Sequence, residues 1–275
     1  MLTRTFCHIP GVGPQSEQRL WRDGVRTWQD AVTAELDGRR GQAIREAASR
    51  SITRLERGDV RHFAQCLPAR EQWRLFADFR HTAAFLDIET TGLGTSDDYV
   101  TSIALYDGRT VRHYVHGKNL AQFEIDVAEY ELLVTYNGKS FDLPFIRRTM
   151  ALRLDQAHID LMHVLRSLGY RGGLKGIERQ LGYARPDMED IDGFFAVLLW
   201  HEFRRTRDPR ALETLLAYNV QDVLNLEPLM VFAFNRKLEA TPFGRELQLP
   251  EPATAPNPFR AHREIVNRLK GGMTG

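Results

Sequence analysis

The order of strand-like and helix-like segments between residues 82 and 162 constrains this chain most strongly. Three runs rich in β-branched and aromatic residues follow one another with only short turns containing Gly or Asp between them. These runs are residues 83–88, 100–106 and 110–115. Because antiparallel neighbours can be joined by short turns, whereas parallel strands need a long crossover, the three runs predict an antiparallel meander.

Two further apolar runs, at residues 132–136 and 158–162, alternate with helical stretches. Strands that alternate with helices predict crossover connections and therefore a parallel continuation of the sheet. Helical patterns continue through residues 194–205 and 211–237. The sequence thus predicts an α/β protein with a mixed five-stranded sheet, three antiparallel strands followed by two parallel ones, flanked by helices. This order of elements resembles the ribonuclease H-like fold.

The sheet region is bordered by two segments of different character. Residues 1–80 contain no run of β-branched residues and are expected to form a helical region. Residues 81–240 hold the predicted sheet and its helices. Five of the twelve prolines fall between Pro242 and Pro258, so residues 241–275 are expected to form an extended, proline-rich tail rather than part of the core.

Composition places the chain among ordinary soluble proteins and argues against several other classes. The hydrophobic share is 43% and the charged share 27%, which is close to the globular average. The longest unbroken apolar run, residues 194–200, is far shorter than the roughly 20 residues of a membrane-spanning helix. The first residues lack the apolar stretch of a secretion signal, and two cysteines do not suggest a disulfide framework. We therefore expect a cytoplasmic protein that does not act at a membrane.

The first candidate site residues are Asp87 and Glu89, at the end of an otherwise apolar strand. Residues two apart on a strand project to the same face, so the two carboxylates lie together. Two like charges this close are costly unless a cation neutralises them, and oxygen ligands suit a hard divalent ion. The alternative for this pair alone is a strand end with two solvated acids.

The second candidate group follows the predicted strand at residues 132–136. Asn137, Lys139 and Asp142 cluster after its carboxyl end, where ligands bind in alternating α/β sheets. The alternative is a helix cap, in which Ser140 or Asp142 accepts hydrogen bonds from the first amides of the next helix.

The third candidate group lies within the predicted helix at residues 211–237. Tyr218 and Asp222 are four residues apart and therefore share a helix face, in the same register as Leu215 and Leu226. A carboxylate beside a buried stripe needs a partner, and a metal site would provide it. A helix N-cap role does not fit, since Asp222 lies in the middle of the predicted helix.

Taken together, these three groups resemble the exonuclease motifs of the DEDD superfamily, in its tyrosine subclass. The matching motifs are Asp87-Ile-Glu89, Asn137-x-x-x-Phe141-Asp142 and Tyr218-x-x-x-Asp222. The chain is also similar to the 3′→5′ proofreading domains of family B DNA polymerases and to bacterial stand-alone predicted exonucleases. The resemblance covers residues 82–235.

This resemblance implies phosphodiester hydrolysis assisted by two divalent cations, Mg²⁺ or Mn²⁺. Asp87 would bridge both ions, and Asp142 would support one of them, largely through water. Glu89 and Asp222 would hold the ion that activates water, and Tyr218 would orient that water.

The resemblance also implies a set of substrate contacts. Backbone groups of the loop after the first motif would hold the terminal 3′ hydroxyl, and Leu93 would wedge against the last base. The alternative for this loop is an ordinary Gly turn. Asn137 and Lys139 would face the backbone of the bound strand. The implied substrate-binding residues are Thr90, Thr91, Gly92, Leu93, Asn137, Lys139, Ser140 and Phe141.

The first 80 residues carry a separate resemblance. Ile9-Pro-Gly-Val-Gly-Pro14 and the helix expected after it resemble half or all of a helix-hairpin-helix module, which binds nucleic-acid backbone. The alternative is a unit that only packs. This region holds 14 arginines against 10 acidic residues, although the whole chain has a net charge of only +1.

These patterns favour a metal-dependent 3′→5′ exonuclease acting on single-stranded or frayed DNA. One alternative is the same chemistry on RNA 3′ ends, because contacts to the 2′-hydroxyl cannot be identified in the sequence. The other is a non-catalytic nucleic-acid-binding module. A degenerate site is expected to have lost at least one acid, and all four are present.

Overall fold

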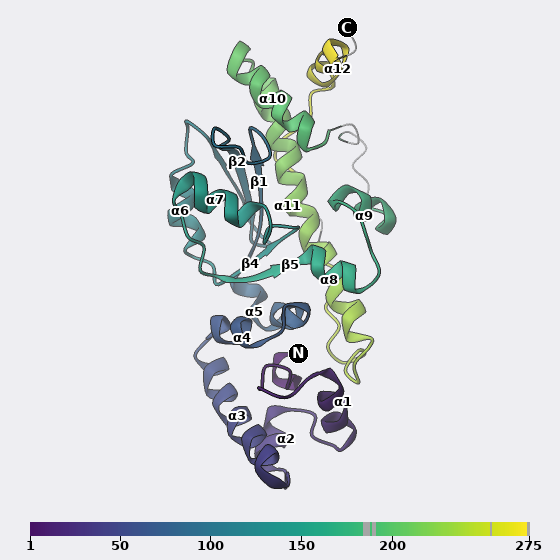
Figure 1. Cartoon of the computed structure of the whole chain (residues 1–275). Coiled ribbons are helices and arrows are strands. Elements are labelled where there is room, and N and C mark those ends of the chain that lie inside the picture. The colour runs from purple at the N-terminus through teal and green to yellow at the C-terminus, as the bar shows by residue number, and fades with distance from the viewer. Residues whose placement is uncertain (184–187, 189–190, 254, 274–275) are drawn as a thin grey trace.

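The structure, a computed structural model, describes residues 1–183, 188, 191–253 and 255–273. Its centre is a five-stranded sheet in the order β3-β2-β1-β4-β5 (Figure 1). The strands are β1 (Ala83–Thr90), β2 (Val100–Tyr106), β3 (Val111–Val115), β4 (Leu132–Thr135) and β5 (Ala157–Asp160). β1 pairs antiparallel with β2, as does β2 with β3, whereas β4 runs parallel to both β1 and β5. The predicted mixed sheet is therefore confirmed.

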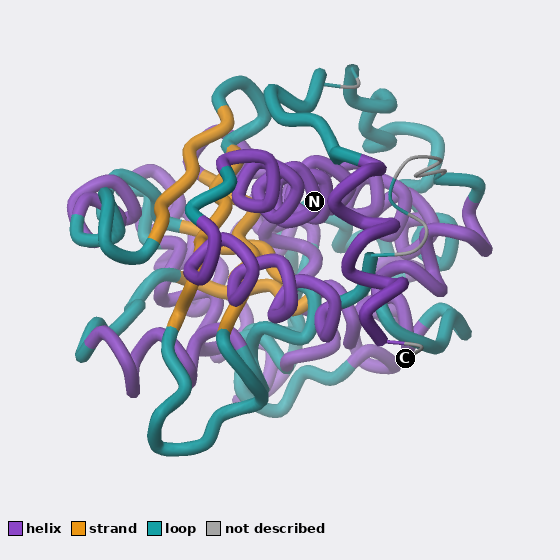
Figure 2. Tube along the Cα trace, turned by 90° about the horizontal axis from the view of Figure 1, so that it is seen from above, coloured by secondary structure: helices purple, strands orange, loops and turns teal. Residues whose placement is uncertain are grey.

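Helices cover both faces of this sheet (Figures 1 and 2). The helices after β3 are α6 (Gln122–Val127), α7 (Asp142–Met150), α8 (Leu161–Ser167), α9 (Leu174–Leu181), α10 (Gly193–Thr206), α11 (Pro209–Leu238) and α12 (Arg263–Met273). The first two pack on one face, α8 and α11 pack on the other, and α10 lies against α11. Among the described residues, no helix has both the length and the apolarity needed to cross a membrane.

Alternation along β1 decides which side chains reach which helices. Leu86 and Ile88 belong to the apolar cluster that includes α6 and α7. Phe85 lies on the opposite face, in the cluster that includes α11. Asp87 and Glu89 share the register of Phe85, because residues two apart on a strand point the same way. The two acids therefore face α11.

Residues 1–82 form helices that range from 3 to 19 residues in length. They are η1 (Leu2–Arg4), α1 (Pro14–Arg22), α2 (Trp28–Thr33), α3 (Gly38–Glu56), α4 (Val60–Cys66), η2 (Ala69–Leu75), α5 (Phe76–Phe79) and η3 (Arg80–Thr82), where η denotes a 3-10 helix. The Gly-containing turn at residues 9–13 leads into α1, and only the short η1 precedes it. The turn is thus followed by a full helix and preceded only by one short 3-10 helix, and the resemblance to a helix-hairpin-helix module stays a prediction.

The N-terminal helices and the sheet share one hydrophobic core. The ring centroid of Trp73 lies 5.4 Å from that of Phe234 on α11. The ring centroid of Phe76 lies 6.2 Å from that of Phe85 on β1. These contacts fix η2 and α5 directly to the elements that carry the candidate site residues.

The segment after residue 240 differs from the expected extended tail. Phe243 is fully buried, and its ring centroid lies 5.3 Å from that of Trp21. Ile265 and Val266 of α12 are buried in a cluster with residues of α10 and α11. Proline restricts the backbone and removes a hydrogen-bond donor, but it does not prevent nearby apolar side chains from packing. The expectation of a tail outside the core is therefore corrected.

Glu17 and Arg74 form an ion pair that joins α1 to η2, with their side chains 1% and 5% exposed. Glu17 also accepts hydrogen bonds from Thr5 and from two backbone N–H groups. Glu17→Ala would leave Arg74 with Glu71 as its remaining acidic partner and would leave the Thr5 hydroxyl and two buried N–H groups without their acceptor, so it should lower the free energy of unfolding by about 3–5 kcal/mol. Glu46→Ala, which removes the partner of exposed Arg50, should cost under about 1 kcal/mol. Urea denaturation measures the free energy of unfolding of both variants. Equal losses in the two would show that the buried Glu17–Arg74 pair contributes no more than the exposed pair.

Candidate functional site

Three carboxylates from two elements converge on one point. Asp87 and Glu89 project from β1, and Asp222 projects from α11, which packs across that face of the sheet. One carboxylate oxygen of each residue lies within 4.8 Å of the others. Glu89 and Asp222 are buried, and Asp87 is partly buried. The structure thus brings the first and third candidate groups together, although they are far apart in the sequence.

Asp142 joins this site from α7. Its Oδ1 accepts a hydrogen bond from the backbone N–H of Ile88 at 3.2 Å, so the carboxylate lies beside β1. Asp142 is buried and lines the same cleft as the other acids, outside the tightest group of three. α7 has no side-chain cap hydrogen bond, and Ser140 is exposed. The Asp142 carboxylate also accepts a hydrogen bond from its own N–H, the first of α7, so Asp142 combines a contact at the start of the helix with its place beside β1.

Burial and like charges raise the pKa of two of these acids. The pKa of Asp87 lies well above its usual value, because of burial first and then of the neighbouring carboxylates. Burial also raises the pKa of Asp142 to about 7, although the N–H groups of Ile88 and of Asp142 itself oppose the shift. A divalent cation would relieve this repulsion, and Mg²⁺ and Mn²⁺ prefer oxygen ligands. The donor set fits such an ion.

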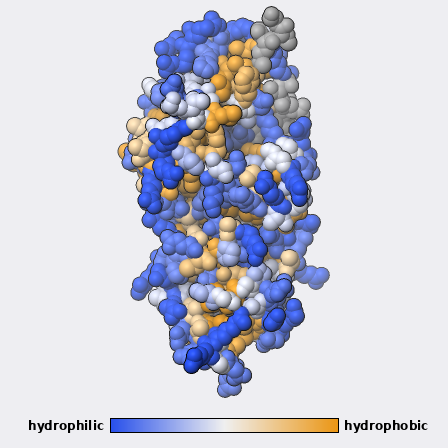
Figure 3. Space-filling model, in the orientation of Figure 1, coloured by the Kyte–Doolittle hydropathy of each residue, from blue (hydrophilic) through white to orange (hydrophobic). Residues whose placement is uncertain are grey.

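The acids lie in a cleft of about 500 Å³. Its lining includes most of the predicted substrate-binding residues, namely Thr90, Thr91, Gly92, Leu93, Asn137 and Phe141. Leu93 is 95% exposed, and Phe194 at the start of α10, which also lines the cleft, is 62% exposed. Apolar surface gathers over α10 in Figure 3. The cleft therefore combines buried acids with exposed apolar side chains.

Tyr218 lines the cleft about one helical turn before Asp222. Its ring is buried, and the ammonium group of Lys175 on α9 lies 4.7 Å from the ring centroid. A cation over the face of an aromatic ring is attracted to it. Lys175 therefore helps to hold the phenol ring in its position on the α11 face that also carries Asp222.

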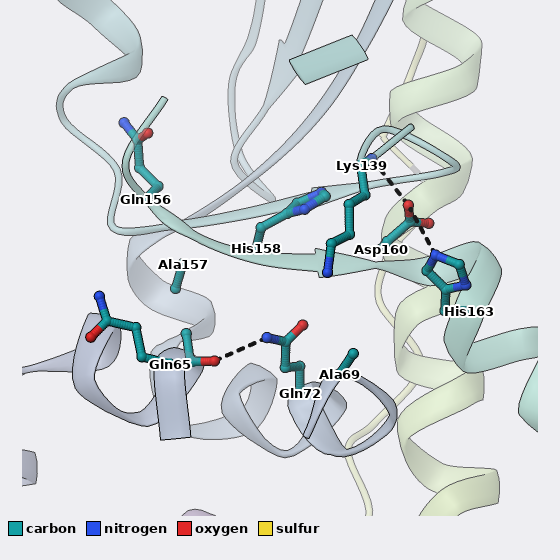
Figure 4. A pocket seen from close by; sticks show the side chains of 10 residues that line it. Gln65, Ala69, Gln72, Lys139, Gln156, Ala157, His158, Asp160 and His163 are labelled. Atoms are coloured by element: carbon teal, nitrogen blue, oxygen red, sulfur yellow. Dashed lines mark hydrogen bonds and ion pairs between the residues drawn. The ribbon is translucent and has the colours of Figure 1, made fainter. Parts of the chain in front are cut away.

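Two of the predicted substrate-binding residues lie outside the cleft. Lys139 points into a separate pocket of about 200 Å³, which it lines with His158 and His163 of the β5 region and with side chains of α4 and η2 (Figure 4). Ser140 is exposed and lines neither pocket. Asn137 has a left-handed backbone with a φ of 64°. This conformation ends the alternation of side chains between the two faces of the preceding strand. Residues 137 and 139 consequently face different pockets.

Asp160, at the end of β5, holds the loop that contains these residues. Its carboxylate accepts hydrogen bonds from the backbone N–H of Asn137 at 2.9 Å and of Lys139 at 3.1 Å. A Cβ atom at Gly138 would lie 2.2 Å from Oγ1 of Thr135, so the loop approaches β4 too closely for any other residue. These contacts fix the entry into α7.

Asp98, which no motif indicated, shapes the loop after the first motif. Its carboxylate accepts hydrogen bonds from the N–H groups of Gly94 at 2.9 Å and Thr95 at 2.7 Å, and from the hydroxyl of Thr91 at 3.1 Å. The hydrogen bonds from Gly94 and Thr95 lower the pKa of Asp98 to about 2, since they favour the charged carboxylate. The available sequence signal is an Asp shortly after a Gly, a pattern common to many turns.

Asn219 is the second supporting residue that the motifs did not indicate. It is fully buried on α11, and its Nδ2 donates a hydrogen bond to Oδ2 of Asp87 at 2.7 Å. The sequence signal is an amide next to Tyr218 within a buried stretch of helix, where a polar group needs a partner. The identity of that partner depends on the tertiary structure.

A sequence profile of the RNase H superfamily matches residues 84–233. The match spans more than half of the chain and contains all four acids and Tyr218. The chain belongs to the RNase H superfamily. Members of this superfamily are typically nucleases, and their fold generally uses divalent metal ions.

Individual proteins similar to this RNase H superfamily member include an uncharacterized protein of Bacillus subtilis (strain 168), YprB, with 30% identity over 208 residues. That match covers 68% of this chain and 49% of YprB, so the chain spans about half the length of this curated relative. The family B DNA polymerase of the hyperthermophilic archaeon Pyrobaculum calidifontis has 16% identity and a TM-score of 0.42. The match covers 57% of this chain and 24% of the polymerase.

Asp142 should make stability without metal depend on pH. Its pKa rises from an ordinary value of 3.8 to about 7, so the folded protein binds this proton more tightly than the unfolded chain. The wild type should therefore lose stability as the pH rises through that interval. Asp142→Asn cannot ionise and should lack this loss. In EDTA, its Tm relative to that of the wild type should be several degrees higher at pH 8 than at pH 5.

Asp155→Asn is a matched control for this experiment, because Asp155 is 53% exposed and pairs with Arg153 at the surface. Its Tm should follow that of the wild type at both pH values. Thermal melts followed by circular dichroism measure all three proteins. The same pH dependence in Asp142→Asn and in the wild type would show that Asp142 ionises normally.

Proposed function

We propose that the chain is a metal-dependent 3′→5′ exonuclease that hydrolyses phosphodiester bonds of single-stranded or frayed DNA. The observation that carries this proposal is the convergence of Asp87, Glu89, Asp142, Tyr218 and Asp222 in one cleft. Membership of the RNase H superfamily supports nuclease chemistry. The presence of all four acids favours an active enzyme over a non-catalytic binding module.

The proposed roles of the site residues are those that the family resemblance implies, and the positions of the residues support them. Asp87, Glu89, Asp142 and Asp222 would hold two divalent cations, Mg²⁺ or Mn²⁺. The oxygens of Asp87, Glu89 and Asp222 already lie within 4.8 Å of one another, which is close enough to hold one such ion. Such ions, when bound, supply an activated water and stabilise charge on the attacking and leaving oxygens. Asp142 would support the site from α7, where the Ile88 N–H orients its carboxylate. Tyr218 would orient the attacking water through its phenol group.

The cleft favours the end of a single strand over an intact duplex. Its volume of about 500 Å³ is typical of sites that enclose small molecules, so it would admit the terminal residues of a strand and exclude a double helix. Leu93 and Phe194 offer exposed apolar surface against which unpaired bases can pack. Lys139 and Ser140 lie outside the cleft and would contact only the strand beyond it.

Incubation with 5′-labelled DNA and RNA oligonucleotides, with and without Mn²⁺, tests this proposal. We expect a ladder of products that shortens from the 3′ end, requires the metal, and forms faster from single-stranded DNA than from duplex. Shortening of RNA alone would reassign the substrate to RNA 3′ ends. The absence of shortening on every substrate would refute the exonuclease assignment.

Asp87→Ala and Asp222→Ala should each abolish this hydrolysis while the protein remains folded. Removing one carboxylate from a repelling cluster relieves repulsion, so the Tm without metal should stay equal or rise. Asp155→Ala changes an exposed acid that pairs with Arg153 and should keep wild-type activity. Near-wild-type turnover of either site variant would overturn the assignment of metal ligands.

Tyr218→Phe should lower the rate by about 10²–10⁴-fold, the usual cost of losing one positioned group in acid–base chemistry. Metal affinity should stay unchanged, since the phenol is assigned to water and not to a cation. Tyr130→Phe is the control, because its phenol bonds Asp107 and does not line the cleft. Single-turnover kinetics at saturating Mn²⁺ separate the two variants. Wild-type kinetics for Tyr218→Phe would make Tyr218 a packing residue.

A further inference from the structure

Asn219 connects helix α11 to both strands beneath the acidic site. Its Nδ2 donates hydrogen bonds to Oδ2 of Asp87 at 2.7 Å and to the backbone carbonyl of Asp87 at 3.3 Å. Its Oδ1 accepts a hydrogen bond from Oγ of Ser102 at 3.0 Å. Both Asn219 and Ser102 are completely buried. The amide therefore has partners on both sides and is shielded from water.

The neighbouring groups determine which way this amide points. A backbone carbonyl can only accept hydrogen bonds, so the nitrogen of Asn219 must face Asp87 and the oxygen must face Ser102. Ser102 lies directly opposite Glu89 in the pairing of β1 with β2. Its hydroxyl is thus held by the same strand pair that carries the acids. The acceptor-only oxygens of Asp87 therefore set the direction of the amide, and the Ser102 hydroxyl, which can donate or accept, donates to the remaining amide oxygen.

Asn219 contacts Asp87 without itself lining the cleft. It is fully buried and is not among the residues that line the cleft. Its bond to Oδ2 opposes rotation of the Asp87 carboxylate about its terminal torsion, which is otherwise broad for this side chain. The second bond, to the carbonyl of the same residue, fixes the amide relative to the backbone of β1.

We propose that Asn219 is a positioning residue that holds the Asp87 carboxylate in the orientation needed to bind a divalent cation, with Ser102 supporting the Asn219 amide through a hydrogen bond to its oxygen. This inference rests on the proposed function, because Asp87 is a metal ligand in that proposal. Groups that orient ligand side chains in this way commonly affect metal affinity about 10–100-fold. A residue that only fills space at this point would have no such effect.

Asn219→Leu tests this inference, because it keeps the approximate volume of the side chain and removes its hydrogen bonds. Isothermal titration with Mn²⁺ alone, at fixed pH, should show an affinity about 10–100-fold below that of the wild type. Asn235→Leu is the matched control. Asn235 lies further along α11, and its amide makes an equivalent pair of bonds to the backbone of Leu249. Its loss should leave Mn²⁺ affinity unchanged.

Ser102→Ala provides a second variant that removes one hydroxyl and leaves Asn219 in place. It should weaken Mn²⁺ binding in the same direction as Asn219→Leu and by a smaller factor, so the test holds even where Asn219→Leu does not fold. Wild-type Mn²⁺ affinity in the folded variants would overturn the role of Asn219 and leave the proposed function intact. If the wild type itself bound no Mn²⁺, the metal-dependent function would fail instead.

Discussion

Carboxylates that share a buried site repel one another, and the fold of this chain brings three of them to one point. Asp87 and Glu89 come from one strand and Asp222 from a helix, so the fold itself forces them together. Charges that are removed from water repel one another more strongly than they would at the surface. The hydrogen bonds that reach Asp87 and Asp142 from Asn219 and Ile88 come from neutral groups and offset only part of this cost. Bound cations would offset the rest of the repulsion between the carboxylates.

Apolar packing on both sides of the acids stabilises the fold against this repulsion. On α11, Leu215 and Leu226 lie before and after the segment that carries Asp222, and both are buried. On the sheet, Leu86 and Ile88 of β1 are anchored against the opposite layer of helices. The acids cannot move apart without disturbing these contacts. The site is therefore held rigid by residues that have no part in its chemistry.

The sequence allowed the strands and the main acids to be predicted because both depend on local patterns. A spacing of two on a strand places Asp87 and Glu89 on one face, and a spacing of four on a helix does the same for Tyr218 and Asp222. Other features depend on contacts between distant residues. The bond from Asn219 to Asp87 joins positions that are 132 residues apart, and no periodicity encodes it.

Local geometry also limited what could be predicted near the second motif. Lys139 follows Asn137 by two positions, which on a strand would place both on one face, but the left-handed backbone of Asn137 directs them to different pockets. The extended tail was expected from proline content, which does not report where a single aromatic residue such as Phe243 packs. In both cases the deciding factor was a conformation or contact that composition and spacing do not specify.

The packing of β5 links the N-terminal helices to the acidic site, independently of any contact they make with nucleic acid. Asp160 ends β5 and bonds the backbone of Asn137 and Lys139, the loop that leads to Asp142. β5 also contacts α4 and η2, and Asp160 lines the second pocket together with these helices and Lys139 (Figure 4). A displacement of these helices would shift β5 and Asp160, and with them the loop that leads to Asp142. The first 80 residues thus pack against the strand whose end holds the loop of the second motif.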